Sequence, residues 1–333
     1  MRGNKSAYAL NRLTVSGLVQ GVSALSLSGC TVRLPHSILN SAGPHAGYME
    51  WMSWLMLIVY GIVFVVTLLI LGLALIARKR DRPVLGTRFV VIAGAAIPTV
   101  ILVIMLILDI RIHKKIADAR EDFHVQVIGH GWWFEVRYPE QGIVDANEIH
   151  VPAGRMVRFE LSAANMIHSF WVPRLGGKRD QLPDHPNQLR LEASHPGVYH
   201  GVCTEYCAGQ HARMGFRLVA HTPEDFQRWI LHRRRSPPVP FDPRLLRGMD
   251  VFLNSGCASC HSVRGVSQGD IGPDLTHVGS RLTLGAGRFD NTWGLMSGWI
   301  ANPQALKPRN LMPRSYLPPD DLHTVVDYLR SLK

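Results

Sequence analysis

Two long blocks of apolar, uncharged residues dominate the first third of the chain. They cover residues 51–77 and 89–108, and neither contains a charged side chain. Each block is long enough to cross a bilayer core of about 30 Å as a helix. Pro98 is tolerable there, because a packed membrane bundle can satisfy the backbone group that a proline frees. We therefore predict a transmembrane hairpin over residues 51–110.

After residue 120 the pattern changes to short β-type runs separated by Gly, Pro and Asn. Regularly spaced strands without helical stretches between them are typical of a sandwich or barrel. We therefore predict an all-β domain over residues 120–222. Its expected strands include residues 125–128, 148–152, 157–161 and 215–219.

A helical pattern follows the β-type runs. Thr222 ahead of Pro223 is typical of a helix N-terminus, and residues 236–240 are rich in proline and therefore stiff. We predict a helix and linker over residues 223–242 and an all-α domain over residues 243–333. Apolar residues at helical spacing mark its first and last helices, namely Leu245, Leu246, Met249 and Phe252, and then Leu322, Val325, Val326 and Leu329.

Residues 1–29 have the pattern of a bacterial export signal, with scattered basic residues ahead of a modest apolar stretch. The sequence Leu-Ser-Gly-Cys that ends at Cys30 matches the lipobox at which a lipoprotein signal is cut and the new N-terminal cysteine is lipidated. The alternative is an uncleaved tail with an incidental cysteine. Residues 30–50 would form a periplasmic segment ahead of the first membrane span.

The formal net charge of +11 raises the question of a nucleic-acid partner. No nucleic-acid-binding motif accompanies the basic residues, so we predict no such partner. The basic run at residues 233–235 is interpreted as a solvated face, directed at anionic lipid or at a partner protein.

The five cysteines are an odd number, so a disulfide framework would leave one unexplained. A second assignment uses all of them. Cys30 lies in the lipobox, Cys203 and Cys207 lie in one loop, and Cys257 and Cys260 lie in one motif. The cysteines therefore indicate two separate cofactor sites.

The first candidate site has the pattern C-x3-C-x3-H-x2-M at Cys203, Cys207, His211 and Met214, with His168 upstream. Thiolate, imidazole and thioether together form a soft ligand set that selects copper. Two thiolates in one loop can bridge two coppers, each with one imidazole and one weak axial ligand. The alternatives are a disulfide or a zinc site, although zinc would not need the methionine.

The second candidate site is the C-x-x-C-H motif of covalent haem attachment. Cys257 and Cys260 would bond the haem, and His261 would be its proximal axial ligand. Met312 is the candidate for the distal ligand, whereas Met296 lies between tryptophans at helical spacing and is interpreted as a core residue. A thioredoxin-like redox pair is the alternative, but the required βαβ context is missing.

Residues 45–235 resemble subunit II of the haem–copper cytochrome c oxidases. The resemblance is carried by the C-x3-C-x3-H-x2-M loop, by residues 168–171 and 175–178, and by the aromatic run at residues 132–134. It implies a cupredoxin-like Greek-key barrel after a two-helix hairpin, with a dinuclear CuA centre.

The same resemblance assigns roles to two further residues. The carbonyl of Glu205 would complete the copper site, and its carboxylate would help to hold a magnesium or manganese ion at the boundary with subunit I. Trp132 matches the tryptophan through which electrons reach the copper centre, and the alternative for Trp132 is a packed core aromatic. The family commonly has an acid near the start of the second helix, but residues 87–98 contain none, which leaves the proton route open.

Residues 243–333 resemble a class I cytochrome c. Gly248, Phe252 and Tyr328 match the contact between the first and last helices of that fold. Pro273 matches the proline whose carbonyl orients the haem-ligating histidine, and residues 307–313 resemble the loop that supplies the distal methionine.

Together the two resemblances imply subunit II of a terminal oxidase with a fused cytochrome c, the caa-type arrangement. Electrons would pass from haem c to CuA and on to subunit I, which reduces oxygen to water in respiration coupled to proton translocation. This chain itself would do no oxygen chemistry. The expected partners are subunit I, the other oxidase subunits, the bilayer, and an upstream cytochrome or quinol–cytochrome c reductase as donor.

Haem c is attached outside the cytoplasm, so both soluble domains are expected on the periplasmic side of a bacterial inner membrane. The basic flanks of the two spans do not decide this orientation by themselves. Two alternative functions remain. One is the electron-accepting subunit of a CuA-containing nitric oxide reductase, which would need the same copper site. The other is a copper-delivery protein, against which the membrane spans and the haem motif argue.

Overall fold

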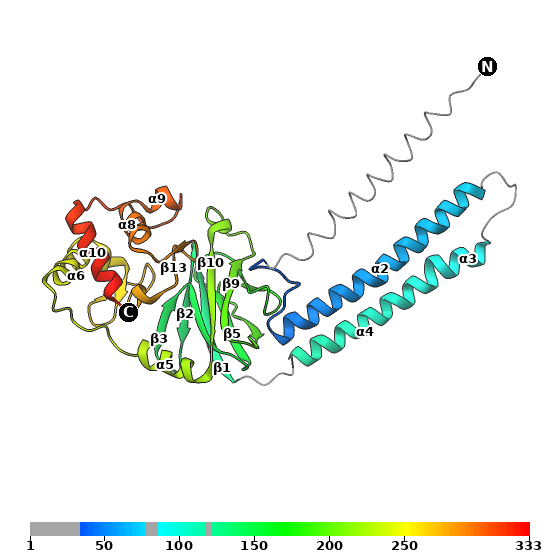
Figure 1. Cartoon of the computed structure of the whole chain (residues 1–333), viewed down its shortest axis with the longest axis horizontal. Helices are drawn as coiled ribbons and strands as arrows, with labels where there is room; N and C mark the ends of the chain where they lie inside the picture. Colours follow the sequence, from blue (N-terminus) through cyan, green and yellow to red (C-terminus); the bar gives the residue numbers. More distant parts are fainter. Residues whose placement is uncertain (1–33, 78–85, 118–121) are drawn as a thin grey trace, which may run out of the picture.

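The computed structural model describes residues 34–77, 86–117 and 122–333. The predicted export signal, Cys30 and most of the loop between the two apolar helices lie outside the described residues. Figure 1 shows a pair of long helices, a β domain in the middle, and a helical domain at the opposite end from the helix pair.

The two apolar blocks form two long helices at one end of the molecule (Figure 1). The first is α2 (Pro44–Ala77), and the second runs through α3 (Thr87–Val91), a π-helical turn η2 (Ile92–Ala96) and α4 (Ile97–Ala117). By length and composition both helices could cross a membrane. Of the most apolar 18-residue stretch of each helix, the share that is buried within the protein is 0% for the first and 6% for the second. Both helices extend beyond the predicted ranges.

The π-helical turn ends two residues before Pro98. A proline inside a helix has no N–H to donate, and its ring clashes with the carbonyl four residues earlier. A widened turn at this place relieves that clash, and such turns are a recognised cause of local irregularity in helices. The sequence therefore remains helical through the proline, as predicted.

The β domain consists of two five-stranded sheets. The parallel pairs are β1–β5 and β4–β10, whereas the other paired strands are antiparallel. One sheet has the order β3 (Ile143–Ala146), β2 (Trp133–Tyr138), β1 (Phe123–His130), β5 (Val157–Ala163) and β8 (Asn187–Leu191). The other has the order β4 (Glu148–Pro152), β10 (Gly215–His221), β9 (Gly197–Cys203), β6 (His168–Trp171) and β7 (Arg179–Gln181). The four predicted strands lie in β1, β4, β5 and β10, so the cupredoxin-like prediction is confirmed.

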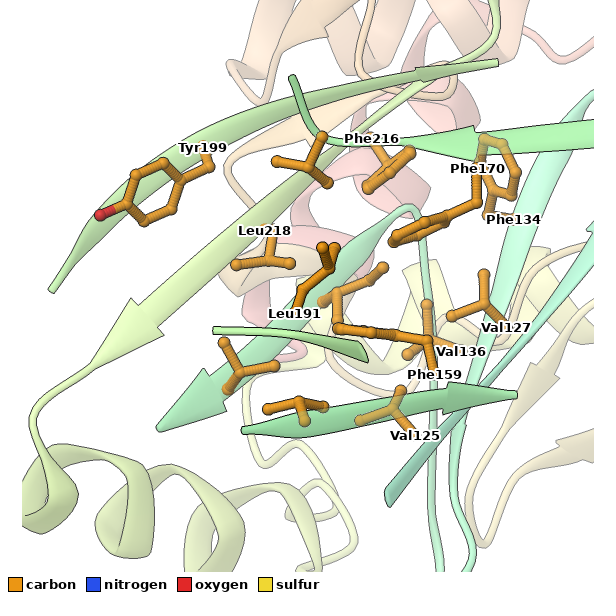
Figure 2. Packing of buried hydrophobic residues seen from close by; sticks show 14 of the residues in the cluster. Val125, Val127, Phe134, Val136, Phe159, Phe170, Leu191, Tyr199, Phe216 and Leu218 are labelled. Carbon is orange, nitrogen blue, oxygen red and sulfur yellow. The ribbon is translucent and has the colours of Figure 1, made fainter. Parts of the chain in front are cut away.

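The core of the β domain lies between the sheets and is rich in aromatic rings (Figure 2). Phe170 of β6 stacks on Phe216 of β10 with 4.6 Å between ring centroids. Gly201 faces the same ring, and a Cβ atom there would lie 2.1 Å from Phe216. The ends of β6 and β9 that carry the candidate copper ligands are therefore fixed by close packing.

Helix α5 (Pro223–Arg233) closes one end of the β domain. The Thr222 hydroxyl caps it by accepting a hydrogen bond from the Asp225 N–H at 3.2 Å, as predicted. Phe226, Trp229 and Ile230 pack into the core of the β domain. An exposed segment rich in proline then leads to the helical domain.

The helical domain matches the predicted all-α type, with two very short strand pairs added. Gly248 lies where the first and last helices cross, and a Cβ atom there would lie 2.1 Å from the Thr324 carbonyl. Phe252 and Tyr328 contact each other at 5.9 Å between ring centroids, so the predicted helix contact is confirmed. The helices are α6 (Pro243–Asn254), α7 (Cys257–Cys260), α8 (Trp293–Ala301), α9 (Pro303–Leu306) and α10 (Pro319–Ser331), and the strands are β11 (Ser262–Val263), β12 (Ser267–Gln268), β13 (Thr283–Leu284) and β14 (Phe289–Asp290).

The predicted apolar faces of this domain are largely confirmed. Val325, Val326 and Leu329 of α10 are buried, and Phe252 of α6 is fully buried. Leu246 departs from the prediction because it is 39% exposed. Helical spacing alone placed it on the buried face, but the crossing at Gly248 turns it toward the edge of that face.

Candidate metal centre and haem-attachment site

The candidate copper ligands come from two neighbouring strands and the loop between β9 and β10. Cys203 is the last residue of β9, and its N–H donates to the carbonyl of Met214 at 3.0 Å, which closes the loop. His168 begins β6, which pairs with β9. The short 3-10 helix η3 (His211–Arg213) brings His211 back toward Cys207. The β-sheet therefore positions residues that are far apart in the sequence.

The donor atoms of all the predicted ligands converge. Cys203 Sγ lies 3.7 Å from Cys207 Sγ and 3.9 Å from His168 Nδ1. Cys207 Sγ lies 3.7 Å from His211 Nδ1 and 4.0 Å from Met214 Sδ. His168, Cys203 and Cys207 are buried, and their ligand atoms all lie within 4.8 Å of one another. The backbone carbonyl of Glu205 is 3.3 Å from Cys203 Sγ.

These distances discriminate between the predicted alternatives. A disulfide requires about 2.05 Å between its sulfurs, so the 3.7 Å separation excludes one in this structure. Two thiolates that share a metal ion at ~2.3 Å each and a near-tetrahedral angle lie about 3.8 Å apart, so the observed spacing fits a shared ion. The thioether of Met214 beside them favours copper over zinc. The residues present therefore fit a copper centre.

The two thiols have different proton affinities. The Cys207 thiol, as a hydrogen-bond donor to Cys203, lowers the pKa of Cys203, whereas the neighbouring Cys203 thiolate raises the pKa of Cys207. The shared hydrogen bond therefore favours one thiolate beside one thiol. A cation between the sulfurs would stabilise the second thiolate in the same way, because thiolates are the metal-binding form of cysteine.

Trp132 lies directly against the copper loop. Its indole N–H donates a hydrogen bond to the carbonyl of Cys207. The ammonium of Lys307, from the helical domain, donates to the Trp132 carbonyl at 3.3 Å and to the Gly285 carbonyl at 3.2 Å. Burial, followed by the nearby charge of Arg213, lowers the pKa of Lys307 to about 8. Trp132 therefore lies between the copper loop and the helical domain.

The side chain of Glu205 is partly buried. In the described part of the chain its carboxylate has no hydrogen-bond or ion-pair partner, and the neighbouring Tyr206 is 76% exposed. The family resemblance implied a place for this carboxylate at a boundary with another subunit, which stays a prediction.

The haem-attachment motif begins with the one-turn helix α7. Cys257 and Cys260 are free thiols at intermediate burial. His261 Nδ1 donates to the carbonyl of Pro273 at 2.8 Å; a carbonyl can only accept, so the ring keeps Nε2 free for a metal. Burial lowers the pKa of His261, and the Pro273 hydrogen bond partly offsets this effect. The predicted orienting role of Pro273 is thus matched by a direct contact.

Glycine is required where the chain passes over the ring of His261. A Cβ atom at Gly272 would lie 2.5 Å from His261 Cε1, and one at Gly269 would lie 2.5 Å from the His261 backbone nitrogen. Neither distance is possible for a real side chain. The imidazole is therefore held between a hydrogen bond on one edge and backbone on its face.

The two methionines of the helical domain have different surroundings. Met296 is 2% exposed within the core, as predicted for a packing residue. Met312 is only partly buried and packs on the same core as Cys257. Its N–H donates to Asn310 Oδ1 at 2.8 Å, and Gln304 Nε2 donates to its carbonyl at 3.1 Å. The methionine loop is thus fixed while the thioether stays at the rim of the core.

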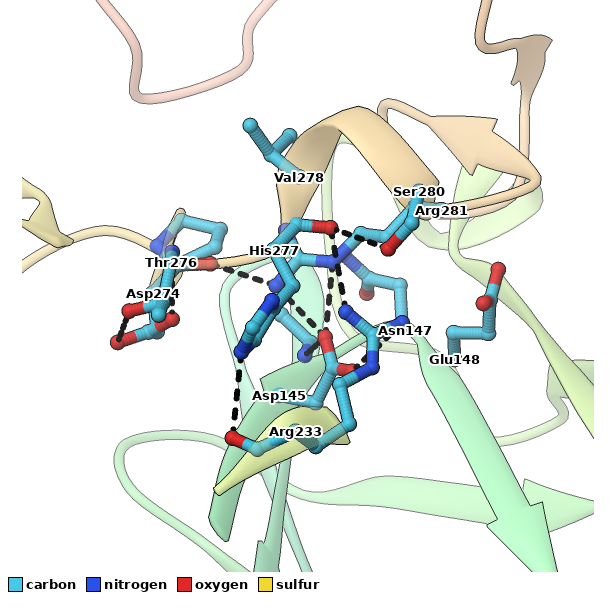
Figure 3. Close-up of polar contacts among 12 residues, drawn as sticks. Asp145, Asn147, Glu148, Arg233, Asp274, Thr276, His277, Val278, Ser280 and Arg281 are labelled. Atoms are coloured by element: carbon cyan, nitrogen blue, oxygen red, sulfur yellow. Dashed lines mark hydrogen bonds and ion pairs between the residues drawn. The ribbon is translucent and has the colours of Figure 1, made fainter. Parts of the chain in front are cut away.

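A buried ionic cluster between the domains was missed by sequence reasoning (Figure 3). Arg233 was expected in a solvated basic run, but it is 3% exposed and lies 3.7 Å from Asp145. Arg281 donates to Asp145 from Nε at 2.8 Å, and the pair is buried. The basic run gave no signal for this role, because its partners are remote in the sequence.

A membrane hairpin, a cupredoxin-like domain with a Cys–His–Met loop, and a cytochrome c-like domain together define a membrane-anchored subunit of an oxidoreductase complex. The family description "Cytochrome C oxidase subunit II, periplasmic domain" matches residues 141–220, and "Cytochrome c" matches residues 245–333. The first domain implies a CuA centre and the second implies haem c.

Relatives extend the similarity over almost the whole chain. Cytochrome c oxidase subunit 2 of Alkalihalophilus pseudofirmus is 33% identical over 326 residues, which cover 93% of this chain and 94% of the relative. Cytochrome c oxidase subunit 2 of Bacillus sp. (strain PS3) is 29% identical over 278 residues, which cover 77% of this chain and 78% of the relative. The chain belongs to the cytochrome c oxidase subunit II family, with a fused cytochrome c domain.

The family assignment bears on the alternatives that the sequence left open. The relatives are oxidase subunits, so the comparisons favour the oxidase over the nitric oxide reductase. The alternative interpretation as a copper-delivery protein on a thioredoxin fold is excluded, because the domain that carries the cysteine loop is a cupredoxin-like domain of two sheets.

Proposed function

We propose that this chain passes electrons from a haem c on Cys257, Cys260, His261 and Met312 to a CuA centre, and on to subunit I for the reduction of oxygen. The proposed copper ligands are His168, Cys203, Cys207, His211, Met214 and the carbonyl of Glu205. The observation that carries the proposal is the position of Trp132. Its indole donates to the Cys207 carbonyl while its own carbonyl accepts from Lys307 of the cytochrome domain.

The copper pair and the haem each supply a one-electron carrier, and the protein supplies their positions. Two strands and the loop between β9 and β10 present the two thiols, the imidazoles and the thioether close together. The Pro273 carbonyl fixes the ring of His261, so that Nε2 alone is available for iron. Both arrangements keep ligands in place as the charge of the site changes, which favours fast transfer.

The remaining parts of the proposal concern the surroundings. Both soluble domains would lie on the periplasmic side of a bacterial inner membrane, held by the two apolar helices. Subunit I and other oxidase subunits would be the partners, and an upstream cytochrome or quinol–cytochrome c reductase would be the donor. The proposed domain ranges are 51–110 for the hairpin, 120–222 for the CuA domain and 243–333 for the cytochrome domain.

The carboxylate of Glu205 is proposed to help hold a magnesium or manganese ion at the boundary with subunit I. The carbonyl and the carboxylate of the same residue would then serve different metals. Glu205→Gln keeps the carbonyl, so the copper spectrum should stay unchanged while the bound magnesium or manganese falls. Unchanged contents of both ions would refute this role of Glu205.

The order of reduction tests the main proposal. The assembled oxidase is mixed rapidly with a reduced cytochrome, and the haem c bands and the near-infrared copper absorption are followed. The haem should be reduced first and the copper second, before any change at subunit I. Reduction of the copper ahead of the haem would contradict the proposed order.

A further inference from the structure

A hairpin of the cytochrome domain, residues 281–291, lies against the β domain next to the copper loop; we call it the docking hairpin. At its tip, the Ala286 carbonyl accepts a hydrogen bond from the Gly215 N–H at 2.9 Å. Gly215 directly follows Met214, a proposed copper ligand. The tip therefore reaches the backbone that ends the copper loop.

The contact at the tip depends on close approach of two backbones. A Cβ atom at Gly287 would lie 3.0 Å from the carbonyl carbon of Gly215, and Gly287 has a φ of +75°. The Gly287 carbonyl also accepts from Arg217 Nη2 at 3.1 Å. Lys307 adds a third connection, because its ammonium joins the Gly285 carbonyl to the Trp132 carbonyl.

The base of the docking hairpin is held by buried charges, which we call the interdomain lock: Asp145, Arg233 and Arg281 (Figure 3). Arg281 contacts Asp145 Oδ1 from Nε at 2.8 Å and from Nη2 at 2.7 Å. Arg233 Nη2 lies 3.7 Å from Asp145 Oδ2. The exposed fractions of the three residues are 2%, 3% and 7% in the order named.

The interdomain lock is also connected to the haem-attachment site. Arg281 Nη2 donates to the carbonyl of Asp274 at 2.6 Å. Asp274 follows Pro273, whose carbonyl accepts from His261. On the other side, the N–H of Leu282 donates to the carboxylate of Glu148 at 2.8 Å. Arg281 thus joins Asp145 of the β domain to the segment that orients His261, the proposed haem ligand.

Two domains of one chain usually move relative to each other unless their interface is large and well packed. Burying a carboxylate and two guanidinium groups is costly unless each keeps its partners in a fixed geometry. These charges come from both domains, so Asp145 is paired with Arg281 only while the domains stay in this orientation. The interface is therefore built for a persistent contact.

We propose that the interdomain lock and the docking hairpin hold the cytochrome domain in one orientation on the copper loop, with Trp132 reserved for the chain's own haem. Electron transfer from haem to copper then needs no docking step. This inference rests on the proposed function and adds the residues that position its two cofactors. Asp145, Arg233 and Arg281 are positioning residues, since none of them touches a proposed cofactor ligand directly.

The first test compares Asp145→Asn with Asp320→Asn in the assembled oxidase. Asp320 lies in the exposed first turn of α10 and makes no contact with the β domain. In both variants the haem and copper spectra should remain. Asp145→Asn should slow haem-to-copper transfer about tenfold or more, because small misplacements lower rates steeply, and should make the rate fall further with added salt. The control should behave like the parent.

A rate for Asp145→Asn within the error of the parent, with both spectra intact, would overturn the interdomain lock. The two proposals can fail separately. A parent oxidase that lacks either cofactor, or that never passes electrons from haem to copper, would contradict the proposed function instead.

The second test needs no change at the interface and covers the case in which Asp145→Asn fails to assemble. A protease site is inserted in the exposed linker at residues 236–241, and the assembled oxidase is cut. Asp145 and Arg233 then stay in one fragment and Arg281 in the other. A locked cytochrome domain should stay bound through gel filtration and keep its transfer rate. Release of the cytochrome fragment on cutting would overturn the proposal.

Discussion

The two candidate cofactor sites are built on different principles. Most of the copper donors belong to the core of the β domain: Cys207 and Met214 are each 2% exposed and His168 is fully buried, whereas His211 is only partly buried. Around the haem motif the corresponding residues, including Cys257 and Met312, are only partly buried at the rim of a smaller core. We therefore expect the metal to add little to the core of the β domain, and the haem to supply part of the core of the cytochrome domain.

The largest effect is expected from removing the haem attachment. The double variant Cys257→Ala, Cys260→Ala should lack covalent haem, and the cytochrome domain should become sensitive to protease because its apolar rim loses the group that it packs on. The β domain should keep its copper absorption. Haem staining, limited proteolysis and copper absorption check this. A haem-free cytochrome domain as protease-resistant as the parent would remove the proposed contrast between the sites.

The matching change at the copper site is Cys207→Ser. Copper content should fall from two ions to none or one, and electrons should stop at the haem. The β domain should nevertheless stay folded, since its core is formed by the sheets rather than by the metal. Metal analysis and circular dichroism measure the two effects. Unfolding of the β domain on loss of copper would show that both sites depend on their cofactors alike.

A smaller effect is expected from Asp145→Asn, which sharpens the comparison by separating the domains without touching either cofactor. Leaving two buried arginines without their carboxylate should cost about 3–5 kcal/mol at neutral pH. Burial raises the pKa of Asp145, but the charges of Arg281 and then Arg233, with smaller contributions, outweigh it and lower the pKa to about 2. The part of the parent's advantage that depends on the ionised Asp145 carboxylate should therefore be complete above pH about 4 and be lost as the pH falls through about 2. Denaturant unfolding of both proteins across this pH range measures it, and a constant difference would argue against Asp145 as the group responsible.

The smallest effect on stability is expected from Met312→Ala. The side chain is partly buried, and its loop is fixed by Asn310 and Gln304 rather than by the thioether. The haem should stay attached but lose its sixth ligand and its low-spin spectrum, and its potential should fall. Met296→Ala is the matched control, since it should keep the spectrum but cost about 2–5 kcal/mol of stability. An unchanged low-spin spectrum in Met312→Ala would point to another ligand.

The sequence predicted those parts of the molecule whose signal is local. The strand at residues 148–152, the cap at Thr222 and the C-x-x-C-H motif each depend on a few neighbouring residues, and all lie where they were expected. The soft ligand set also pointed to His168, upstream of the loop, and the pairing of β6 with β9, which places Phe170 opposite Cys203, brings it close to the thiols. Local pattern and family motifs together therefore identified the set of converging donor atoms.

The interface between the domains could not be predicted in this way. Arg233 belongs to a basic run that is usually solvated, and it is buried because it meets partners remote in the sequence, Asp145 of a distant strand and the His277 carbonyl of the other domain. The docking hairpin has strands of two residues each, β13 and β14, which are too short to give a periodic signal. Contacts of this kind depend on how two finished domains fit together, and no single segment encodes them.

The central claim is that one chain holds two coppers and one covalent haem. It is tested most directly by the metal and haem content of the purified chain, measured together with its absorption spectrum. We predict two coppers and one haem c per chain, with a near-infrared copper band beside the haem bands. Zinc in place of copper, or a single copper ion without the near-infrared band, would contradict the account.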